Sequence, residues 1–153
     1  MPPLFRAMNV TLGLLADAAN ATADSKLNVL GVFDRIFAGT FPAIHPSMTL
    51  VVRFEADSVE RDQTKQIAIL LVDADGAEVL QIQSEIRVQA GQGGEPTIYL
   101  QILGLVGVNF PHAGNYEFVI MIGGEPKHRV PLKLLNGASS NLTIQPPQLS
   151  PGA

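Results

Sequence analysis

The sequence predicts an all-β fold, an antiparallel β-sandwich of about eight strands with an immunoglobulin-like or jelly-roll-like architecture. Most long segments alternate apolar and polar residues with a period of two, as strands do when they bury one face. Turn-forming residues separate these segments at intervals of about ten residues, a spacing typical of sandwiches. The segments between them lack the apolar spacing of a helix, which disfavours an α/β arrangement.

The first part of the chain is expected to contain four strands, at residues 9–16, 27–33, 36–41 and 48–56. In the first of them, apolar residues from Val10 onward alternate with polar or small ones, which favours a strand. A helix over residues 12–23 is the alternative, since Leu and Ala dominate there, but Gly13 and Asn20 weaken it. A single helical turn at residues 32–37 is a second alternative, and residues 17–26 are expected to form a polar connection.

The second part is expected to contain four more strands, at residues 65–73, 78–88, 97–106 and 115–123, with 128–135 as a ninth strand or an edge. Residues 67–72 are apolar on both faces, so this strand lies in the centre of its sheet or in an interface. Pro131 cannot donate a backbone hydrogen bond, so the last strand is an edge or carries a bulge there.

The end of the chain differs in composition from the rest. After about residue 135 the periodicity stops, and Pro, Ser and Gly become frequent. We therefore expect a single β-sandwich domain over residues 1–135 and a C-terminal tail over residues 136–153, with at most a short strand at residues 141–144.

Composition and charge limit the partners that the chain can have. Hydrophobic residues make up 46% of it and charged residues only 16%, below the average of about 25% for soluble domains. So few charges leave apolar surface for a protein partner or another copy to cover, and we predict a homo-oligomer or a protein complex. The net charge of −4 gives no reason to expect nucleic acid. No apolar run reaches the roughly 18 residues of a membrane span.

Residues 6–23 have some features of a secretory signal. Arg6 precedes an apolar stretch, and residues 19–21 and 21–23 have the Ala-x-Ala form of a cleavage site. Asn9 interrupts the apolar stretch, however, and Asp17 lies just before the cleavage site. We therefore expect no signal peptide and a cytoplasmic location.

The inventory of residues for catalysis is small. The chain has no cysteine, which excludes disulfides, thiol nucleophiles and thiolate metal sites. Its three histidines, His45, His112 and His128, do not have the spacing of a metal-ligand pair. No serine lies in the Gly-x-Ser-x-Gly motif of a nucleophile elbow. We predict no catalytic residues and no cofactor, and we expect that the chain is not an enzyme.

Four Asx residues near the start are the candidates for a cation site. Asp17, Asn20, Asp24 and Asp34 would converge if the first two strands formed a hairpin, and their oxygens suit a hard cation. Asx residues beside turns more often bond to their own backbone, and we prefer that interpretation. Residues 73–76 resemble the start of a calcium loop, but the position that needs a bidentate Glu holds Ser84.

Several segments resemble a bacterial family of uncharacterised proteins, a domain of unknown function. They are LADAAN (residues 15–20), KLNVLGVFDRIFAGTFPAIHPSMTLVVRFEA (26–56), LVDADG (71–76) and NFPHAGNYEFVIMIGGEPKHRVPLKL (109–134). The resemblance covers about residues 8–135, and it is sharpest at residues 17–34 and at a closing β-hairpin marked by Pro111, Gly114, Tyr116 and Phe118. It implies a bacterial origin and a compact β domain. It implies no activity, no cofactor and no catalytic residue.

These observations favour a non-catalytic binding or assembly module that acts through protein–protein contacts or self-association. The alternative is a sandwich that binds a small ligand, a carbohydrate or a cation through loops at one end. Such a site would draw on Asp17, Asn20, Asp24, His45 or His112. The absence of Trp disfavours carbohydrate, because sugar sites usually present exposed aromatic rings. An enzyme is the third hypothesis.

Overall fold

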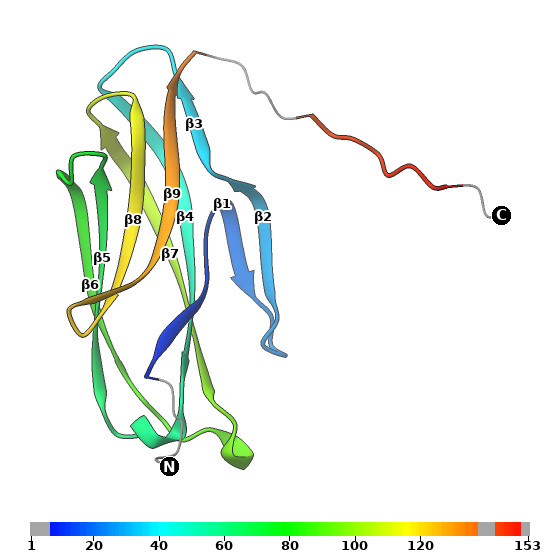
Figure 1. Ribbon diagram of the computed structural model, residues 1–153, viewed down its shortest axis with the longest axis vertical. Coiled ribbons are helices and arrows are strands. Elements are labelled where there is room, and N and C mark those ends of the chain that lie inside the picture. Colours follow the sequence, from blue (N-terminus) through cyan, green and yellow to red (C-terminus); the bar gives the residue numbers. More distant parts are fainter. Residues whose placement is uncertain (1–6, 138–142, 151–153) are drawn as a thin grey trace.

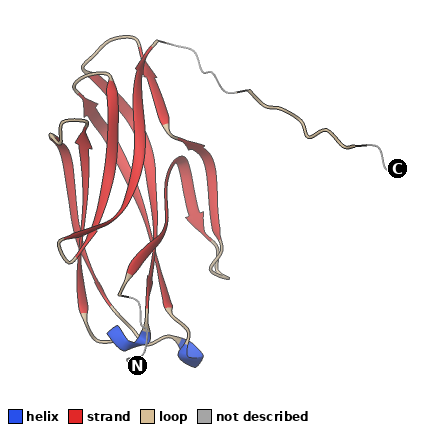
Figure 2. Cartoon of the chain, viewed as in Figure 1, coloured by secondary structure: helices blue, strands red, loops and turns tan. Residues whose placement is uncertain are grey.

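Nine strands form two sheets that pack face to face, which confirms the predicted β-sandwich (Figure 1 and Figure 2). The computed structural model describes residues 7–137 and 143–150. Within these ranges, helical structure is limited to two short 3₁₀ turns, η1 (Ser58–Glu60) and η2 (Gln92–Gly94). None of the helical segments in the described ranges has the length and apolarity needed to cross a membrane.

The strands divide four to one sheet and five to the other. Sheet A has the order β2 (Leu27–Phe33), β1 (Asn9–Ala21), β4 (Ala43–Ala56) and β7 (Thr97–Phe110). Sheet B has the order β3 (Arg35–Ala38), β9 (Glu125–Asn136), β8 (Gly114–Ile122), β5 (Thr64–Asp73) and β6 (Glu78–Arg87). Every pair of neighbours is antiparallel except β3 and β9, which are parallel.

The core lies between the two sheets and follows from the period-two pattern. Leu50 and Phe54 of β4 point inward from sheet A, and Ile69 of β5 and Phe118 of β8 meet them from sheet B. All four are at most 1% exposed. Full burial of a side chain of this kind stabilises the fold by about 1.5–3 kcal/mol. Alternate residues of the same strands point away from this core, which makes the two outer faces of the sandwich.

The first strand is longer than predicted. β1 continues to Ala21, so the predicted polar connection over residues 17–26 was wrong, and only the turn after Ala21 remains of it. The reason is pairing: β2 lies antiparallel to this part of β1, from Ala18 opposite Leu30 to Ala21 opposite Leu27, and satisfies its backbone. The helical alternatives at residues 12–23 and 32–37 were also wrong, because these segments form β1, β2 and the start of β3.

β4 and β7 are likewise longer than predicted, and β3 is shorter. β4 and β7 pair over their whole length, from Ala43 opposite Phe110 to Ala56 opposite Thr97. β4 therefore begins before the predicted strand at 48–56, and β7 ends after the predicted strand at 97–106. Pro46 did not stop the strand, because β4 and β7 pair on both sides of it, at His45 opposite Val108 and at Ser47 opposite Val106.

The order of sheet B explains two features of the later strands, the apolar residues on both faces of β5 and the proline in β9. β5, which is apolar on both faces, lies inside the sheet between β8 and β6. β9 lies between β3 and β8, but β3 pairs only with residues from Lys133 to Asn136. Pro131 therefore lies where β9 has a free side and needs no donor.

The chain changes sheets between β2 and β3. β2 is the outer strand of sheet A and β3 the outer strand of sheet B, with Asp34 alone between them. The backbone oxygen of Asp34 accepts a hydrogen bond of 2.9 Å from Lys133 of β9, which holds this crossing in place. Residues 143–150 have no regular secondary structure and extend away from the sheets (Figure 1). The strand predicted at 141–144 lies partly outside the described residues, and Ile144 is not in a strand.

Candidate functional site

The outer face of sheet A is the most distinctive surface of the described chain, and we call it the apolar face. It consists of the side chains that alternate with the core residues of sheet A. They are Leu12, Leu14, Ala16 and Ala18 of β1, Leu30 and Val32 of β2, Thr49, Val51, Arg53 and Glu55 of β4, and Ile98, Leu100, Ile102, Gly104 and Val106 of β7.

Large aliphatic side chains of this face are open to solvent. The exposed fractions are 83% for Val106, 71% for Leu30, 62% for Val32 and 49% for Ile98. Val51 of β4, on the same face, is fully buried although it points away from the core. Large contiguous apolar patches are uncommon on monomeric soluble proteins.

The charges of the apolar face are few and already paired. Arg53 places Nη1 3.7 Å from Oε2 of Glu55, on the same strand. The same Nη1 donates a hydrogen bond of 2.7 Å to the hydroxyl of Thr11. The face therefore carries no net charge, in a chain whose net charge is −4.

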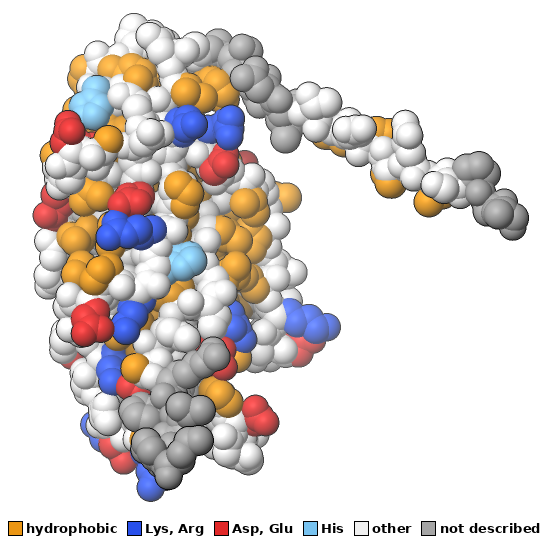
Figure 3. Space-filling view, viewed as in Figure 1, with side chains coloured by type: hydrophobic (Ala, Val, Ile, Leu, Met, Phe, Trp, Pro, Cys, Tyr) orange, Lys and Arg blue, Asp and Glu red, His pale blue; other side chains and the backbone are white. Residues whose placement is uncertain are grey.

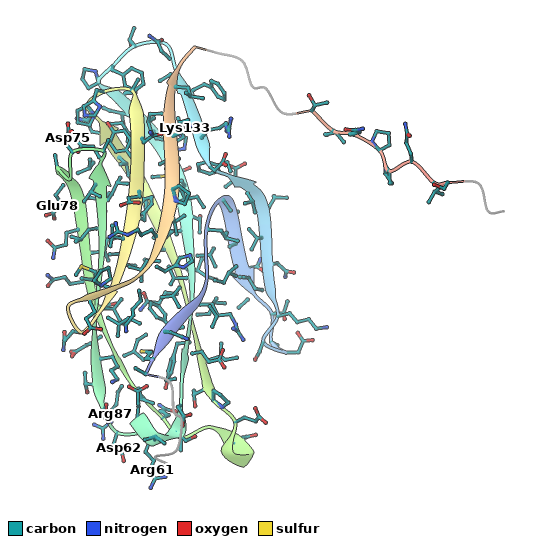
Figure 4. All side chains as sticks on the ribbon, in the orientation of Figure 1. Arg61, Asp62, Asp75, Glu78, Arg87 and Lys133 are labelled. Carbon is teal, nitrogen blue, oxygen red and sulfur yellow. The ribbon has the colours of Figure 1, made fainter. Side chains whose placement is uncertain are left out.

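The outer face of sheet B has the opposite character. Its charged side chains include Glu85, Arg87, Glu117, Arg129 and Lys133. Arg129 of β9 pairs with Glu117 of the neighbouring strand β8. Gln66 donates a 3.0 Å hydrogen bond to Glu85. Figure 3, which looks onto this side of the molecule, shows both signs of charge distributed over it, and Figure 4 labels Lys133 and Arg87 on its strands. The low charge of the apolar face is therefore specific to sheet A and is not explained by the low charge content of the whole chain.

The edge strands differ in the same way. β2 and β7 are the two edges of sheet A, and neither contains a charged residue or a proline. β6, an edge of sheet B, carries Glu78, Glu85 and Arg87, which are the charges that normally protect a free edge from pairing with another chain. The two edge strands of sheet A lack this protection.

A shallow groove lies beside β2, where the chain passes from sheet A to sheet B. Its volume is about 470 Å³, and Phe33 and Phe37 give it an apolar floor. Asp17, Arg35 and His45 contribute its polar side chains. The rings of His45 and Phe33 are 6.1 Å apart. Figure 3 shows hydrophobic side chains gathered over this region, at the right of the molecule.

The structure does not bring the four candidate residues for a cation site together. Asn20 accepts a 3.0 Å hydrogen bond from the side chain of Asn28 on the neighbouring strand. The carboxylate of Asp17 lies against Gly31 and lines the groove. In the described part of the chain, no three Asp, Glu or His side chains are grouped so that they could hold a metal ion.

The other two candidates, Asp24 and Asp34, each have a partner close in sequence. Asp24 accepts a hydrogen bond from Thr22 and lies 3.2 Å from the ammonium of Lys26. The bond from Thr22, and after it the one from Lys26, lowers the pKa of Asp24. Asp34 bonds to Nε of Arg35 at 2.9 Å, and this bond lowers the pKa of Asp34.

His112 belongs to a cluster that the sequence pattern did not indicate. Its Nε2 is 3.2 Å from Oδ2 of Asp73, and its Nδ1 is 3.0 Å from the carbonyl oxygen of Ala113. The ring stacks on Tyr116, whose hydroxyl donates a 2.6 Å hydrogen bond to the His112 carbonyl oxygen. Asp73 and His112 are 39 residues apart in the chain, so no local motif joins them.

Both ring nitrogens of His112 face acceptors, which favours the protonated ring. The bond to the Ala113 carbonyl, followed by the bond to Asp73, raises the pKa of His112. The backbone N–H of Ala77 is the main cause that lowers the pKa of Asp73. The cluster therefore fastens the β5–β6 turn to the β7–β8 turn. His128, in contrast, lies over Gly13 of β1, between the two sheets.

Comparison with known proteins identifies a family and a distant likeness to two structures. The model of a family of unknown function, DUF6941, matches residues 11–135. No curated protein sequence matches the chain. One similar structure is that of the alkylpurine DNA glycosylase AlkC of Pseudomonas fluorescens bound to DNA containing an abasic site analog, with 11% identity and a TM-score of 0.47. Another is a beta-glucuronidase from glycoside hydrolase family 2, with 16% identity and a TM-score of 0.40.

These two likenesses concern a limited part of each larger protein. The first covers 85% of this chain and 31% of the glycosylase chain. The second covers 60% of this chain and 11% of the glucuronidase chain. The chain thus spans less than a third of either structure.

Proposed function

We propose that this chain, which belongs to the family of unknown function DUF6941, is a non-catalytic binding or assembly module. It binds another protein, or a second copy of itself, through the apolar face.

The exposure of large aliphatic side chains on the apolar face is the observation that carries this proposal. Together Val106, Leu30, Val32 and Ile98 are as exposed as two to three whole side chains. Covering them would contribute about 4–8 kcal/mol of transfer free energy. Association costs about 4–15 kcal/mol, so these four residues offset a large part of that cost, and the rest of the face adds to them.

Asp73 and His112 support a non-catalytic role, because both are engaged in holding turns. Asp73 accepts hydrogen bonds from the backbone N–H groups of Asp75 and Ala77, and His112 bonds to Ala113 as well as to Asp73. A catalytic acid or base needs a free position for the substrate proton. Each of these side chains has its bonding positions directed at the protein itself.

A matched pair of variants tests the proposal. Val106→Glu places a charge on the apolar face, and Gln83→Glu places one on the outer face of sheet B; both positions are exposed, so neither change disturbs the core. Light scattering gives the mass of the purified chain, and binding of the dye ANS reports open apolar surface. We expect the wild type to self-associate or to bind ANS. Val106→Glu should reduce that self-association or ANS binding, and Gln83→Glu should leave it unchanged. A wild type that stays monomeric and does not bind ANS contradicts the proposal.

A second candidate function is the binding of a small ligand in the groove beside β2. Its volume of about 470 Å³ lies within the range of about 300–1,000 Å³ that is common for ligand sites. Asp17, Arg35 and His45 would orient a polar ligand over the two phenylalanine rings. Thermal shift with sugars and divalent cations tests this candidate: stabilisation by one of them that His45→Ala removes supports it, and no shift with any of them rejects it.

A further inference from the structure

The groove beside β2 holds a carboxylate in a place that the opposite strand leaves free. In the register of β1 with β2, Asp17 comes opposite Gly31. A Cβ on residue 31 would lie only 2.4 Å from Oδ2 of Asp17, so a larger residue would displace the carboxylate. Gly31 also has a φ of 72°, a conformation that other residues rarely adopt. The local backbone therefore gives the Asp17 carboxylate room at the groove, which it lines.

The charge of Asp17 is open, whereas the guanidinium of the groove is already engaged. Among residues 7–137 and 143–150, Asp17 takes part in no ion pair. Arg35 places its Nε 2.9 Å from Oδ1 of Asp34. With His45 counted as neutral, two carboxylates and one guanidinium give this region a net charge of −1. A positively charged ligand would neutralise it.

The apolar floor of the groove suits the same kind of ligand. Phe33 and Phe37 are both half-buried and line the groove together with Asp17. The face of a phenyl ring attracts a cation, while its carbon surface covers apolar groups. The ring of His45, 6.1 Å from that of Phe33, adds a third flat group. A carboxylate beside flat rings is a combination that recognises an ammonium group carried on a carbon skeleton.

We propose that the groove beside β2 binds a small primary amine, with the ammonium group at Asp17 and the carbon skeleton on Phe33 and Phe37. This inference rests on the second candidate function and names its class of ligand. The volume of about 470 Å³ admits such a molecule. An ammonium donates charge-assisted hydrogen bonds to a carboxylate, which are stronger than bonds between neutral groups. A carboxylate ligand, in contrast, would meet the charge of Asp17 and an Arg35 that already has a partner.

Three probes of the same shape and different charge test the inference on the full chain. They are 2-phenylethylamine, 2-phenylethanol and 3-phenylpropionate, and amide chemical shifts in NMR titrations give both the dissociation constant and the place of binding. We expect the amine to shift the amides of Asp17, Gly31 and Phe33. It should bind at least about 10-fold more tightly than the alcohol, because the ammonium adds a charged hydrogen bond. The propionate should bind most weakly.

A matched pair of variants assigns the preference for the amine to one carboxylate. Asp17→Asn keeps the size of the side chain and removes its charge, and Asp75→Asn makes the same change at the exposed β5–β6 turn (labelled in Figure 4). Asp17→Asn should weaken the amine about 10-fold and leave the alcohol unchanged, which a loss of fold would not do. Asp75→Asn should leave both unchanged, although it alters the net charge equally. Thermal melts confirm that both variants fold.

The outcomes separate this inference from the second candidate function. Equal binding of the amine and the alcohol in the groove overturns the preference for an amine and leaves the groove as a ligand site. Tighter binding of the propionate does the same and assigns the recognition to Arg35. An amine affinity that Asp17→Asn and Asp75→Asn reduce equally also overturns the inference, since attraction by the net charge would then explain it. No binding of any probe, with no thermal shift by sugars or divalent cations, overturns both.

Discussion

The ion pair of Glu60 and Lys65 should respond unequally to the loss of either partner. Glu60 lies in η1, and its carboxylate is paired with the ammonium of Lys65 at the start of β5. The Glu60 side chain is only 4% exposed, whereas that of Lys65 is 20% exposed. One carboxylate oxygen of Glu60, Oε1, has no hydrogen-bond partner within the described residues. Glu60 therefore depends on Lys65 far more than Lys65 depends on Glu60.

The expected magnitudes follow from this difference in burial. Lys65→Met leaves a buried carboxylate without its counter-ion, which should lower the free energy of unfolding by about 3–5 kcal/mol. Glu60→Gln leaves an ammonium that reaches water, so its cost should be nearer about 1–2 kcal/mol. The double change Glu60→Leu with Lys65→Met removes both charges and should be close to neutral, since buried pairs are often replaceable by apolar residues.

Urea unfolding of the three variants, followed by circular dichroism, measures these free energies. In a chain of this length, the loss expected for Lys65→Met corresponds to a fall in Tm of about 6–20 °C. Equal losses below about 1 kcal/mol for both single variants would refute the reasoning. They would mean that the pair behaves as an exposed surface pair.

Three further predictions concern the tertiary contacts. The raised pKa of His112 means that its contribution to stability is complete below about pH 6.5 and is lost as the pH rises through the higher folded pKa; His112→Gln should flatten the urea midpoint across pH 6–8. Tyr116→Phe removes the hydroxyl that bonds to the His112 carbonyl and should cost about 0.5–1.5 kcal/mol, measured by urea unfolding; no change would show that the bond contributes nothing. Gly13→Ala would place a Cβ 2.8 Å from the His128 ring and should cost about 1–3 kcal/mol in the same assay, whereas Gly104→Ala, which meets open space, should cost far less.

The strands could be predicted from sequence because each has a local pattern, but their lengths could not. Alternation from Val10 onward indicated the first strand, yet nothing local showed that it continues to Ala21. Alanine and asparagine have low strand propensity, and here the pairing with β2 outweighs it. The same holds for β4, which continues through Pro46 because β7 follows it along its whole length.

The candidate surface was predictable in kind but not in place. The low charge content indicated apolar surface, and residues 97–106 carry apolar residues on both faces of a strand. Sequence alone does not say which of these faces meets the core, because Leu103 and Ile102 are equally apolar. The order of sheet A decides it, since Leu103 lies opposite the buried Leu50 and Ile102 lies opposite Val51. The contact between His112 and Asp73 depends on the topology in the same way.

The crossing between β2 and β3 has a consequence for how the sandwich unfolds. A single residue, Asp34, separates a strand of sheet A from a strand of sheet B, so the release of β2 from β1 also pulls on the pairing of β3 with β9. The two sheets are therefore coupled at this edge and cannot open independently there. Backbone amides of β2 and β3 should exchange with deuterium as one cooperative unit, although they belong to different layers.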